Sequence, residues 1–461
     1  MSTTTEADRS RQARRAGFAA FLGTSVEWYD FFVFGTASAL VLGKLYFPQA
    51  DPTVGTLAAF ATFGAGYLAR PLGGIVFGHL GDRVGRKSTL IITLLLMGFA
   101  TVVIGLLPTY EQIGIAAPVL LVVFRLIQGI AVGGEWGGAV LIASEHAQKK
   151  HKVAAGAWAQ QGAPAGNLMA AGVFLVVSGL PDDQFMSWGW RLPFLFSAVL
   201  VVIGLVVRLK IEEPQEFLVA LANKKKAAVP FVEVIRKSFG IVMLGAFAAA
   251  LSGSYGTFFK VLGLDYATSI VGMDRQSFLL ALTVMSAAQF VFQPIAAAIV
   301  TRIEPVRVLV CSIILSMALL PVAWVFVTTG NTLLVIVGLV VTIAPIGAQY
   351  ALIAGYLAEA FPTHVRYTGI SLSFQLNSAI FTSMTPLIGG FLIATTGSAW
   401  SIIGFQESIA VVSLVGVLLM TRFTGAGTFR ASESEEAGAQ GSNPGEAGVQ
   451  GVDQGVTAVT R

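Results

Sequence analysis

The stretch Gly78-His79-Leu80-Gly81-Asp82-Arg83-Val84-Gly85-Arg86-Lys87 separates two long apolar segments, residues 54–77 and 89–107. Each apolar segment has about the 20 residues that an α-helix needs to cross roughly 30 Å of hydrocarbon. Glycines permit a tight turn between two antiparallel helices, and Asp82 stands where a carboxylate can cap the helix that follows. The basic residues of the stretch would hold it on the cytoplasmic side of a membrane. The stretch therefore predicts a short loop between two membrane-spanning helices.

The composition of the whole chain excludes most classes of soluble protein. Of its 461 residues, 55% are hydrophobic and 12% are charged, whereas a soluble globular protein has about 25% charged residues. A single cysteine excludes a disulfide framework, and no spacing of cysteine and histidine indicates a zinc site. Low charge and high apolarity also exclude a disordered or nucleic-acid-binding chain. We therefore expect an integral membrane protein.

Apolar stretches of similar length recur along most of the chain. We expect an all-α polytopic membrane protein, because each helix satisfies its own backbone hydrogen bonds in lipid, and because the sequence lacks the short alternating segments of a β-barrel. The predicted transmembrane helices number twelve: 17–42, 54–77, 89–107, 115–143, 154–178, 191–209, 240–262, 278–300, 308–328, 332–357, 367–395 and 400–421.

The longest internal polar loop divides these helices into two groups of six. This basic loop, 210–239, separates an N-terminal half, 17–209, from a C-terminal half, 240–421. Residues 1–16 form a predicted cytoplasmic N-terminal segment. Residues 422–461 are rich in Gly, Ala, Ser and Glu and have few large apolar residues, so we predict a disordered cytoplasmic tail.

The distribution of basic residues predicts the orientation of the chain. With both termini in the cytoplasm, 23 of the 29 lysines and arginines fall in cytoplasmic segments. Cytoplasmic loops of membrane proteins carry such an excess, so we predict a multi-pass protein of the plasma (inner) membrane with both termini inside. The exceptions are Lys44, Arg70, Arg125, Arg191, Lys260 and Arg275.

The loop that begins at Gly78 closely resembles the signature loop between helices two and three of the major facilitator superfamily. Together with further motifs, over residues 17–422, it resembles the metabolite:proton symporter family. Members of this family carry organic acids, shikimate, or proline and betaine, and the first half is most similar to the shikimate branch. The further motifs are Glu27-Trp28-Tyr29-Asp30-Phe31-Phe32, Ala69-Arg70-Pro71-Leu72-Gly73-Gly74, Arg125-Leu126-Ile127-Gln128-Gly129, Trp188-Gly189-Trp190-Arg191-Leu192-Pro193-Phe194 and Ala358-Glu359-Ala360-Phe361-Pro362-Thr363.

The resemblance implies a fold and a set of conformational residues. The fold is the major facilitator fold, with twelve transmembrane helices in two six-helix halves. It also leads us to expect a monomer without a cofactor. The signature loop that the resemblance implies comprises Gly78, Gly81, Asp82, Arg83, Gly85, Arg86 and Lys87.

Three carboxylates and two arginines, Arg70 and Arg125, are predicted to lie inside the membrane. A charge at the bilayer centre costs about 2.5–3.5 kcal/mol, so it normally faces a cavity or a partner. Glu27 and Asp30 share one face of the first helix, about 15–20 Å along it. We interpret Glu27, Asp30 and Glu135 as candidates for proton coupling. Arg125 is a candidate for substrate binding, because a guanidinium binds a carboxylate bidentately. The alternative is that some of these groups form permanent ion pairs between helices.

Polar and aromatic side chains in the other spans complete the predicted substrate site. The alternative for the polar groups of the second half is that each forms a hydrogen bond between helices. Lys260 and Asp265 fall near the outer end of the predicted seventh helix, where we expect them to be interfacial. The remaining candidates for substrate binding are Gln128, Arg70, Trp28, Tyr29, Tyr255, Gln289, Gln293 and Gln375, and further polar groups in the second half are Gln349, Tyr350 and Asn377.

These observations predict a secondary active transporter that takes up a small organic acid together with protons by alternating access. Its partners would be a small metabolite, protons and the lipid bilayer, with no nucleic acid, metal or cofactor. One alternative is a proline or betaine carrier, in which the aromatic faces of Trp28 and Tyr29 would contact the cation. A passive facilitator could share the same fold. A polytopic membrane enzyme is the alternative of a different class, and no nucleophile–base or metal spacing supports it.

Overall fold

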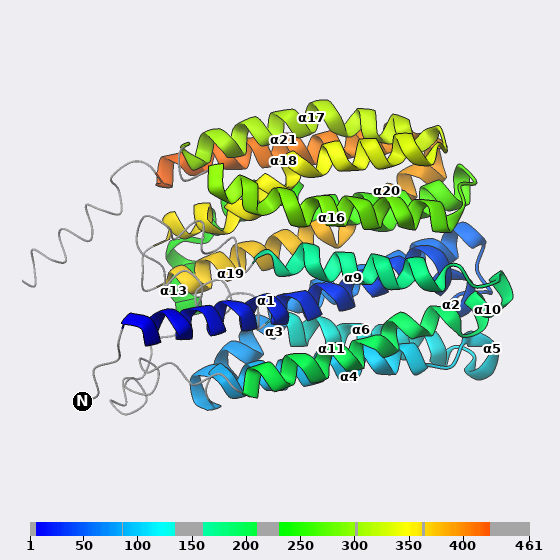
Figure 1. Ribbon diagram of the computed structural model, residues 1–461, viewed down its shortest axis with the longest axis horizontal. Helices are drawn as coiled ribbons and strands as arrows, with labels where there is room; N and C mark the ends of the chain where they lie inside the picture. The colour runs from blue at the N-terminus through cyan, green and yellow to red at the C-terminus, as the bar shows by residue number, and fades with distance from the viewer. Residues whose placement is uncertain are drawn as a thin grey trace, which may run out of the picture.

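The computed structural model describes residues 6–84, 86–133, 160–209, 230–299, 303–361 and 365–424. Within these ranges, every regular element is a helix. The long helices run side by side along the long axis of the molecule, and α1 begins at one end of this bundle (Figure 1). We call this end the N-terminal end and the opposite one the far end.

Within the described residues, each predicted span corresponds to one long helix or to two consecutive helices, so the predicted fold class is confirmed. Residues 134–143 of the fourth predicted span and 154–159 of the fifth lie outside the described residues. Short helices at the far end are α2 (Gly43–Tyr46), α5 (Tyr110–Ile113) and α10 (Asp182–Ser187), and α13 (Pro230–Lys237) lies at the N-terminal end (Figure 1). The long helices are α1 (Glu6–Ala37), α3 (Pro52–Val84), α4 (Arg86–Leu106), α6 (Ala116–Gly133), α9 (Gly162–Val177), α11 (Leu192–Leu209), α14 (Phe239–Ala248) with α15 (Ala250–Thr257), α16 (Arg275–Ile299), α17 (Pro305–Thr328), α18 (Thr332–Glu359), α19 (Arg366–Asn377) with α20 (Met384–Thr396), and α21 (Ala399–Thr424).

Two helices are longer than their apolar segments. The helix α1 begins at Glu6, inside the predicted N-terminal segment, and α3 continues to Val84. Asp82 therefore lies within α3, and the prediction that it stands at a helix cap is wrong. The physical reason is that hydropathy marks the part of a helix that suits lipid, whereas the helix itself can continue into polar surroundings.

Three spans contain π-helical segments, which are wider than an α-helix and are frequent at functional sites. They are η1 (Ser38–Leu42) in the first span, η4 (Phe258–Gly263) and η5 (Tyr266–Ile270) in the seventh, and η6 (Ser378–Thr382) in the eleventh. The seventh span is also bent by 47° between Phe239–Ala248 and Ala250–Ile270. It therefore continues to Ile270, well past the predicted end at residue 262.

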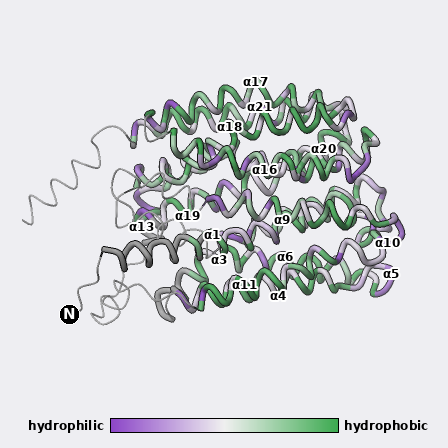
Figure 2. Tube along the Cα trace, viewed as in Figure 1, coloured by the Kyte–Doolittle hydropathy of each residue, from purple (hydrophilic) through white to green (hydrophobic). Residues whose placement is uncertain are grey.

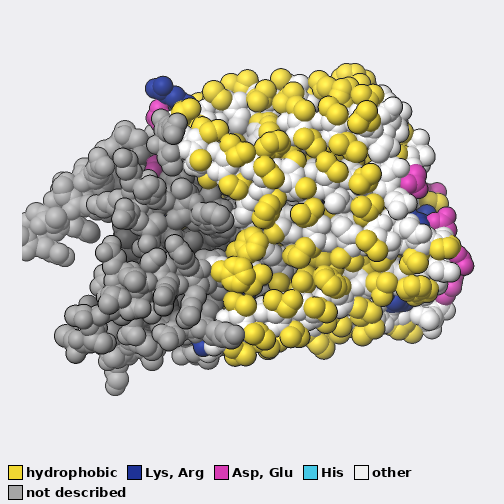
Figure 3. All heavy atoms as spheres, viewed as in Figure 1, with side chains coloured by type: hydrophobic (Ala, Val, Ile, Leu, Met, Phe, Trp, Pro, Cys, Tyr) yellow, Lys and Arg dark blue, Asp and Glu magenta, His cyan; other side chains and the backbone are white. Residues whose placement is uncertain are grey.

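The exterior of the bundle suits a lipid environment. Hydrophobic side chains cover the middle of the visible face, while its coloured charged side chains lie at the two ends (Figure 3). The same apolar character follows the helices along most of their length (Figure 2). Large apolar residues such as Leu106, Val176 and Phe391 are more than half exposed. Contiguous exposed apolar surface of this kind is what a membrane covers.

Glycines bring α3 and α6 into close contact. A side-chain carbon at Gly129 would overlap the backbone carbonyl of Gly66, and one at Gly133 would overlap the carbonyl of Arg70. The sequence predicts close helix packing from the glycines at every fourth position of this span, and the prediction is confirmed for these two. Gly137, the next in the series, lies outside the described residues.

Candidate functional site

Asp30 lies at the centre of a hydrogen-bond network that joins four helices. It is fully buried in α1, and its carboxylate accepts hydrogen bonds from Ser197 Oγ of α11 at 2.6 Å and from Thr101 Oγ1 of α4 at 2.8 Å. Gln128 Nε2 of α6 donates to the same Thr101 hydroxyl at 2.7 Å, and Arg125 Nη1 donates to Gln128 Oε1 at 2.5 Å. We call these five residues the Asp30 network. It connects a buried carboxylate to a buried guanidinium through neutral groups.

The other groups that the guanidinium of Arg125 contacts also carry no charge. Its Nε and Nη2 donate to the carbonyl oxygen of Phe63, at 3.3 and 3.2 Å. Its guanidinium carbon lies 4.3 Å from the ring centres of Phe31 and Phe34, which places the cation against aromatic faces. No ion pair joins it to Asp30 in the part of the chain that the structure describes. Arg125 is therefore enclosed by protein groups.

Glu27 and Arg70 form an ion pair between α1 and α3. Glu27 Oε1 lies 3.4 Å from Arg70 Nη2, and both side chains are almost fully buried. The guanidinium of Arg70 lies 4.1 Å from the ring centre of Phe31 and 4.5 Å from that of Tyr67. For this pair, the structure has the interhelical ion pair that the sequence left open as the alternative.

A small cavity lies between the two halves of the bundle. Its volume of about 30 Å³ has room for one or two water molecules. The first half contributes residues of α1, α3 and α9, and the second half contributes residues of the seventh, eighth, tenth and eleventh spans. The lining residues that carry polar or aromatic groups are Trp28, Phe32, Tyr67, Asn167, Ser252, Tyr255, Thr257, Lys260, Gln289, Tyr350 and Thr382.

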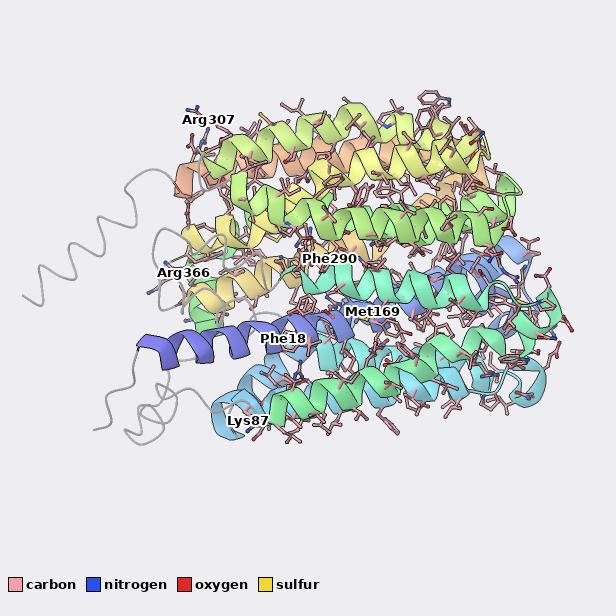
Figure 4. The ribbon with its side chains drawn as sticks, in the orientation of Figure 1. Phe18, Lys87, Met169, Phe290, Arg307 and Arg366 are labelled. Atoms are coloured by element: carbon pink, nitrogen blue, oxygen red, sulfur yellow. The ribbon has the colours of Figure 1, made fainter. Side chains whose placement is uncertain are left out.

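Contacts between the halves lie on both sides of this cavity. On the side of the cavity that faces the N-terminal end, Gln161 Nε2 donates a hydrogen bond to the carbonyl of Phe290 in α16. Phe290 itself lies near the middle of the bundle (Figure 4). Gln375 Nε2 also donates to the carbonyl of Gly133, at 3.4 Å. At the far end, Arg275 at the start of α16 donates to Asp182 Oδ1 of α10 at 2.6 Å. These contacts hold the cavity in a narrow form.

The predicted site residues fall into separate groups. Three of the predicted substrate candidates, Trp28, Tyr255 and Gln289, line the cavity. Tyr29 instead donates to the carbonyl of Pro193 at 2.6 Å. Gln293 is buried, and its amide forms no hydrogen bond with the described residues. Arg70, Arg125 and Gln128 lie outside the cavity lining, in the ion pair and the network described above.

Two parts of the prediction fall wholly or mainly outside the described residues. Glu135 is one of them. The other is most of the signature loop: only Lys87 has a described side chain, and its Nζ donates to the carbonyl of Leu209 at the end of α11, at 2.9 Å. The side chains outside the described set are Gly78, Gly81, Asp82, Arg83, Gly85 and Arg86.

The expected interfacial position of Lys260 is wrong. Its side chain is 5% exposed and lines the cavity, because the seventh span continues to Ile270 and Lys260 therefore lies well inside it. Asp265, one turn further, is partly buried and accepts a hydrogen bond from Ser269 Oγ at 3.1 Å. Tyr67 and Asn167 are further lining residues absent from the predicted site. Asn167 is the one side-chain amide within the apolar helix α9, and a lone polar residue in an apolar span could have indicated a lining position from the sequence.

Comparison with known proteins assigns the family. The family described as "Sugar (and other) transporter" matches residues 16–243. The "Inner membrane metabolite transport protein YhjE" of Escherichia coli is 38% identical over 87% of this chain and 92% of its own length. The chain belongs to the major facilitator superfamily. Within the superfamily, the shikimate transporter of Escherichia coli is 37% identical, over 88% of this chain and 93% of its own length. The proline/betaine transporter of Salmonella typhimurium is 31% identical, over 87% of this chain and 82% of its own length.

Solved structures of the superfamily share the fold. A D-xylose-proton symporter matches with a TM-score of 0.70 at 16% identity, over 89% of this chain and 97% of its own. The predicted resemblance to the metabolite transporters of the superfamily is confirmed, and the chain is a multi-pass membrane transporter of small molecules. Because the related proteins are transporters, the alternative of a membrane enzyme is excluded.

Proposed function

We propose that this transporter takes up a small organic acid together with protons, by alternating access across the plasma (inner) membrane. The observation that carries the proposal is the position of Asp30. It is fully buried in a membrane-spanning helix, and the partners of its carboxylate are the hydroxyls of Ser197 and Thr101 rather than a cation. A carboxyl in such a place can hold a proton in one conformation and release it in another, when its surroundings change.

The Asp30 network offers a way to couple the proton to conformation. Thr101 and Gln128 connect Asp30 to the guanidinium of Arg125. Protonation of Asp30 would remove the negative charge that attracts Arg125, and the interaction between α1 and α6 would weaken. The electrostatic energy lost in this way is larger in the low-dielectric interior of the bundle than the same loss would be in water. We therefore expect protonation to alter how the helices of the first half pack around the cavity.

The proposed orientation has the N-terminal end in the cytoplasm. Lys87, Arg307 and Arg366 all lie toward this end (Figure 4). Basic residues are enriched in cytoplasmic loops, and this clustering supports both termini being inside. Labelling of a cysteine placed near either terminus in intact cells tests the orientation, since a membrane-impermeant reagent should leave it unmodified.

A proline or betaine carrier is the second candidate, and the aromatic lining of the cavity favours it. Trp28, Phe32, Tyr67 and Tyr350 present rings to the cavity, and aromatic faces bind quaternary ammonium groups. Lys260 in the same lining opposes this candidate, because its ammonium would repel the ammonium group of these zwitterionic substrates.

Uptake into proteoliposomes tests the proposal. We would measure accumulation of labelled shikimate, succinate, citrate, proline and betaine, with and without an imposed proton gradient. We expect one of the acids to accumulate only with the gradient. Asp30→Asn should abolish accumulation and retain exchange at zero gradient, while Asp274→Asn, at an exposed helix start, should behave as wild type. Uptake that stops at equal concentrations on the two sides and does not respond to the proton gradient would identify a passive facilitator.

A further inference from the structure

Among the described residues that line the cavity, Lys260 is the one cation. It lies in the π-helical segment η4 and is 5% exposed. Its Nζ lies 4.4 Å from the ring centre of Phe32, which belongs to α1 in the other half of the bundle. Among the described residues, no carboxylate lies within ion-pair distance of it. The cavity therefore contains a lysine whose described neighbour is an aromatic face.

Such a lysine makes the cavity favourable for an anion. An ammonium removed from water needs compensation by a partner of opposite charge or by hydrogen bonds, and an aromatic face compensates it only in part. None of the lining residues in the described part of the chain is acidic. Glu27, a buried acid of the first half, is paired with Arg70. An anionic ligand would supply the missing compensation.

Other lining groups also lack partners. The buried polar atoms of four lining residues form no hydrogen bond with the described part of the chain: Trp28 Nε1, Tyr67 Oη, Tyr350 Oη and Asn167 Oδ1. Buried polar groups are normally hydrogen-bonded, so these groups are available for a ligand. Asn167 Oδ1 can only accept, and it therefore requires a donor such as a hydroxyl. The set fits a carboxylate that also carries hydroxyl groups.

We propose that Lys260 binds the carboxylate of the substrate. Proline and betaine also have a carboxylate, but Lys260 would repel the positive charge that these zwitterions carry, so the cavity would prefer hydroxylated carboxylates without a cationic group. This inference rests on the proposed function and names the residue and the substrate chemistry that it would use. A carboxylate at Lys260 would compete with the ring of Phe32 for the ammonium, so binding would also loosen a contact between the halves. The cavity would have to widen as the halves separate, because its present volume suits water alone.

Exchange transport without a proton gradient tests the inference independently of coupling. Proteoliposomes loaded with unlabelled shikimate, succinate or citrate would exchange against the same labelled acid outside. We expect Lys260→Met to raise the half-saturation concentration by about 10- to 100-fold, the usual effect of losing a hydrogen bond to a charged group. Lys260→Arg should recover most of the affinity. Lys44→Met, which removes an exposed lysine outside the lining, should match wild type.

A neutral analogue shows whether Lys260 recognises charge. The methyl ester of shikimate should compete poorly with shikimate in wild type, and this preference should disappear in Lys260→Met. The inference is overturned if Lys260→Met keeps the wild-type half-saturation, if the ester competes as well as the acid in wild type, or if wild type exchanges none of the acids. If Lys260→Met elutes as aggregate in detergent, Lys260→Gln replaces it. Failure of the proton gradient to drive wild-type accumulation would reject the proposed function and leave this result intact.

Discussion

Arg275 Nη1, at the first residue of α16, donates to Asp182 Oδ1, at the first residue of α10, over 2.6 Å. The two residues belong to different halves of the bundle, and the contact lies at the far end, beyond the cavity. Arg275 Nη2 also donates to the carbonyls of Ser178 and Leu180, at 3.0 Å each, and its guanidinium lies 4.0 Å from the ring centre of Phe185. One arginine therefore closes the far end by several contacts.

We predict that Arg275→Ala opens the far end of the cavity. Loss of the charge-assisted hydrogen bonds should increase the open population by about 10-fold or more. The measurement is the rate at which a membrane-impermeant maleimide labels Thr257→Cys, a lining position, with the native Cys311 replaced by serine. Asp182→Asn is the matched control, since Asp182 is 89% exposed and an exposed ion pair contributes about 0–1 kcal/mol. An unchanged labelling rate in Arg275→Ala would contradict the prediction.

The Asp30 network gives a second prediction, for Thr101→Val. The substitution keeps the shape of the side chain but removes the hydroxyl that joins Asp30 to Gln128. Because buried partners would remain unpaired, we expect a loss of about 1–3 kcal/mol of stability and a marked loss of proton-driven accumulation. Thr93→Val in the same helix is the control, because Thr93 is also buried and bonds only to the carbonyl of Leu90. Equal melting temperatures and equal accumulation in the two variants would show that the link has no role.

The predicted fold follows from features that act locally along the chain. An apolar run of about 20 residues needs a helix in lipid whatever its neighbours are, and the described part of each predicted span is helical. Close packing at Gly129 and Gly133 was also predictable, since small residues at every fourth position of a helix make one smooth surface. The helix ends were less predictable, as α1 and α3 show, because the helical hydrogen bonds continue past the apolar segment.

The site depends on geometry that hydropathy does not encode. Lys260 was expected at an interface because the apolar run weakens after residue 262, yet the span is π-helical, bent and continues to Ile270. The sequence spacing places Glu27 and Asp30 on one helix face, but Glu27 pairs with Arg70 whereas Asp30 belongs to the Asp30 network. Which cation reaches which acid depends on how α1 packs against its neighbours, and spacing along one helix cannot determine it.

The ion pair between Glu27 and Arg70 gives a third prediction. Arg70→Met would remove one member of the buried ion pair with Glu27, and such a removal typically costs about 3–5 kcal/mol. We expect this variant to aggregate or to melt well below wild type in detergent. The double variant Glu27→Gln/Arg70→Met removes both charges and should recover most of the stability. If the double variant is as unstable as Arg70→Met alone, the ion pair is not the reason for the loss.

The contact between α3 and α6 gives the last prediction, which concerns Gly133→Ala. The added carbon would overlap the backbone carbonyl of Arg70, and backbone cannot move aside as a flexible side chain can. The two helices would have to separate, and the ion pair that Arg70 forms with Glu27 would be displaced with them. We therefore expect a lower melting temperature and weaker transport. Gly172→Ala in α9 is the matched control, because nothing lies within 4 Å of the added carbon and alanine favours a helix by up to about 1 kcal/mol over glycine. The two substitutions should consequently shift the melting temperature in opposite directions. A Gly133→Ala variant that melts at or above the wild-type temperature would refute close packing at Gly133.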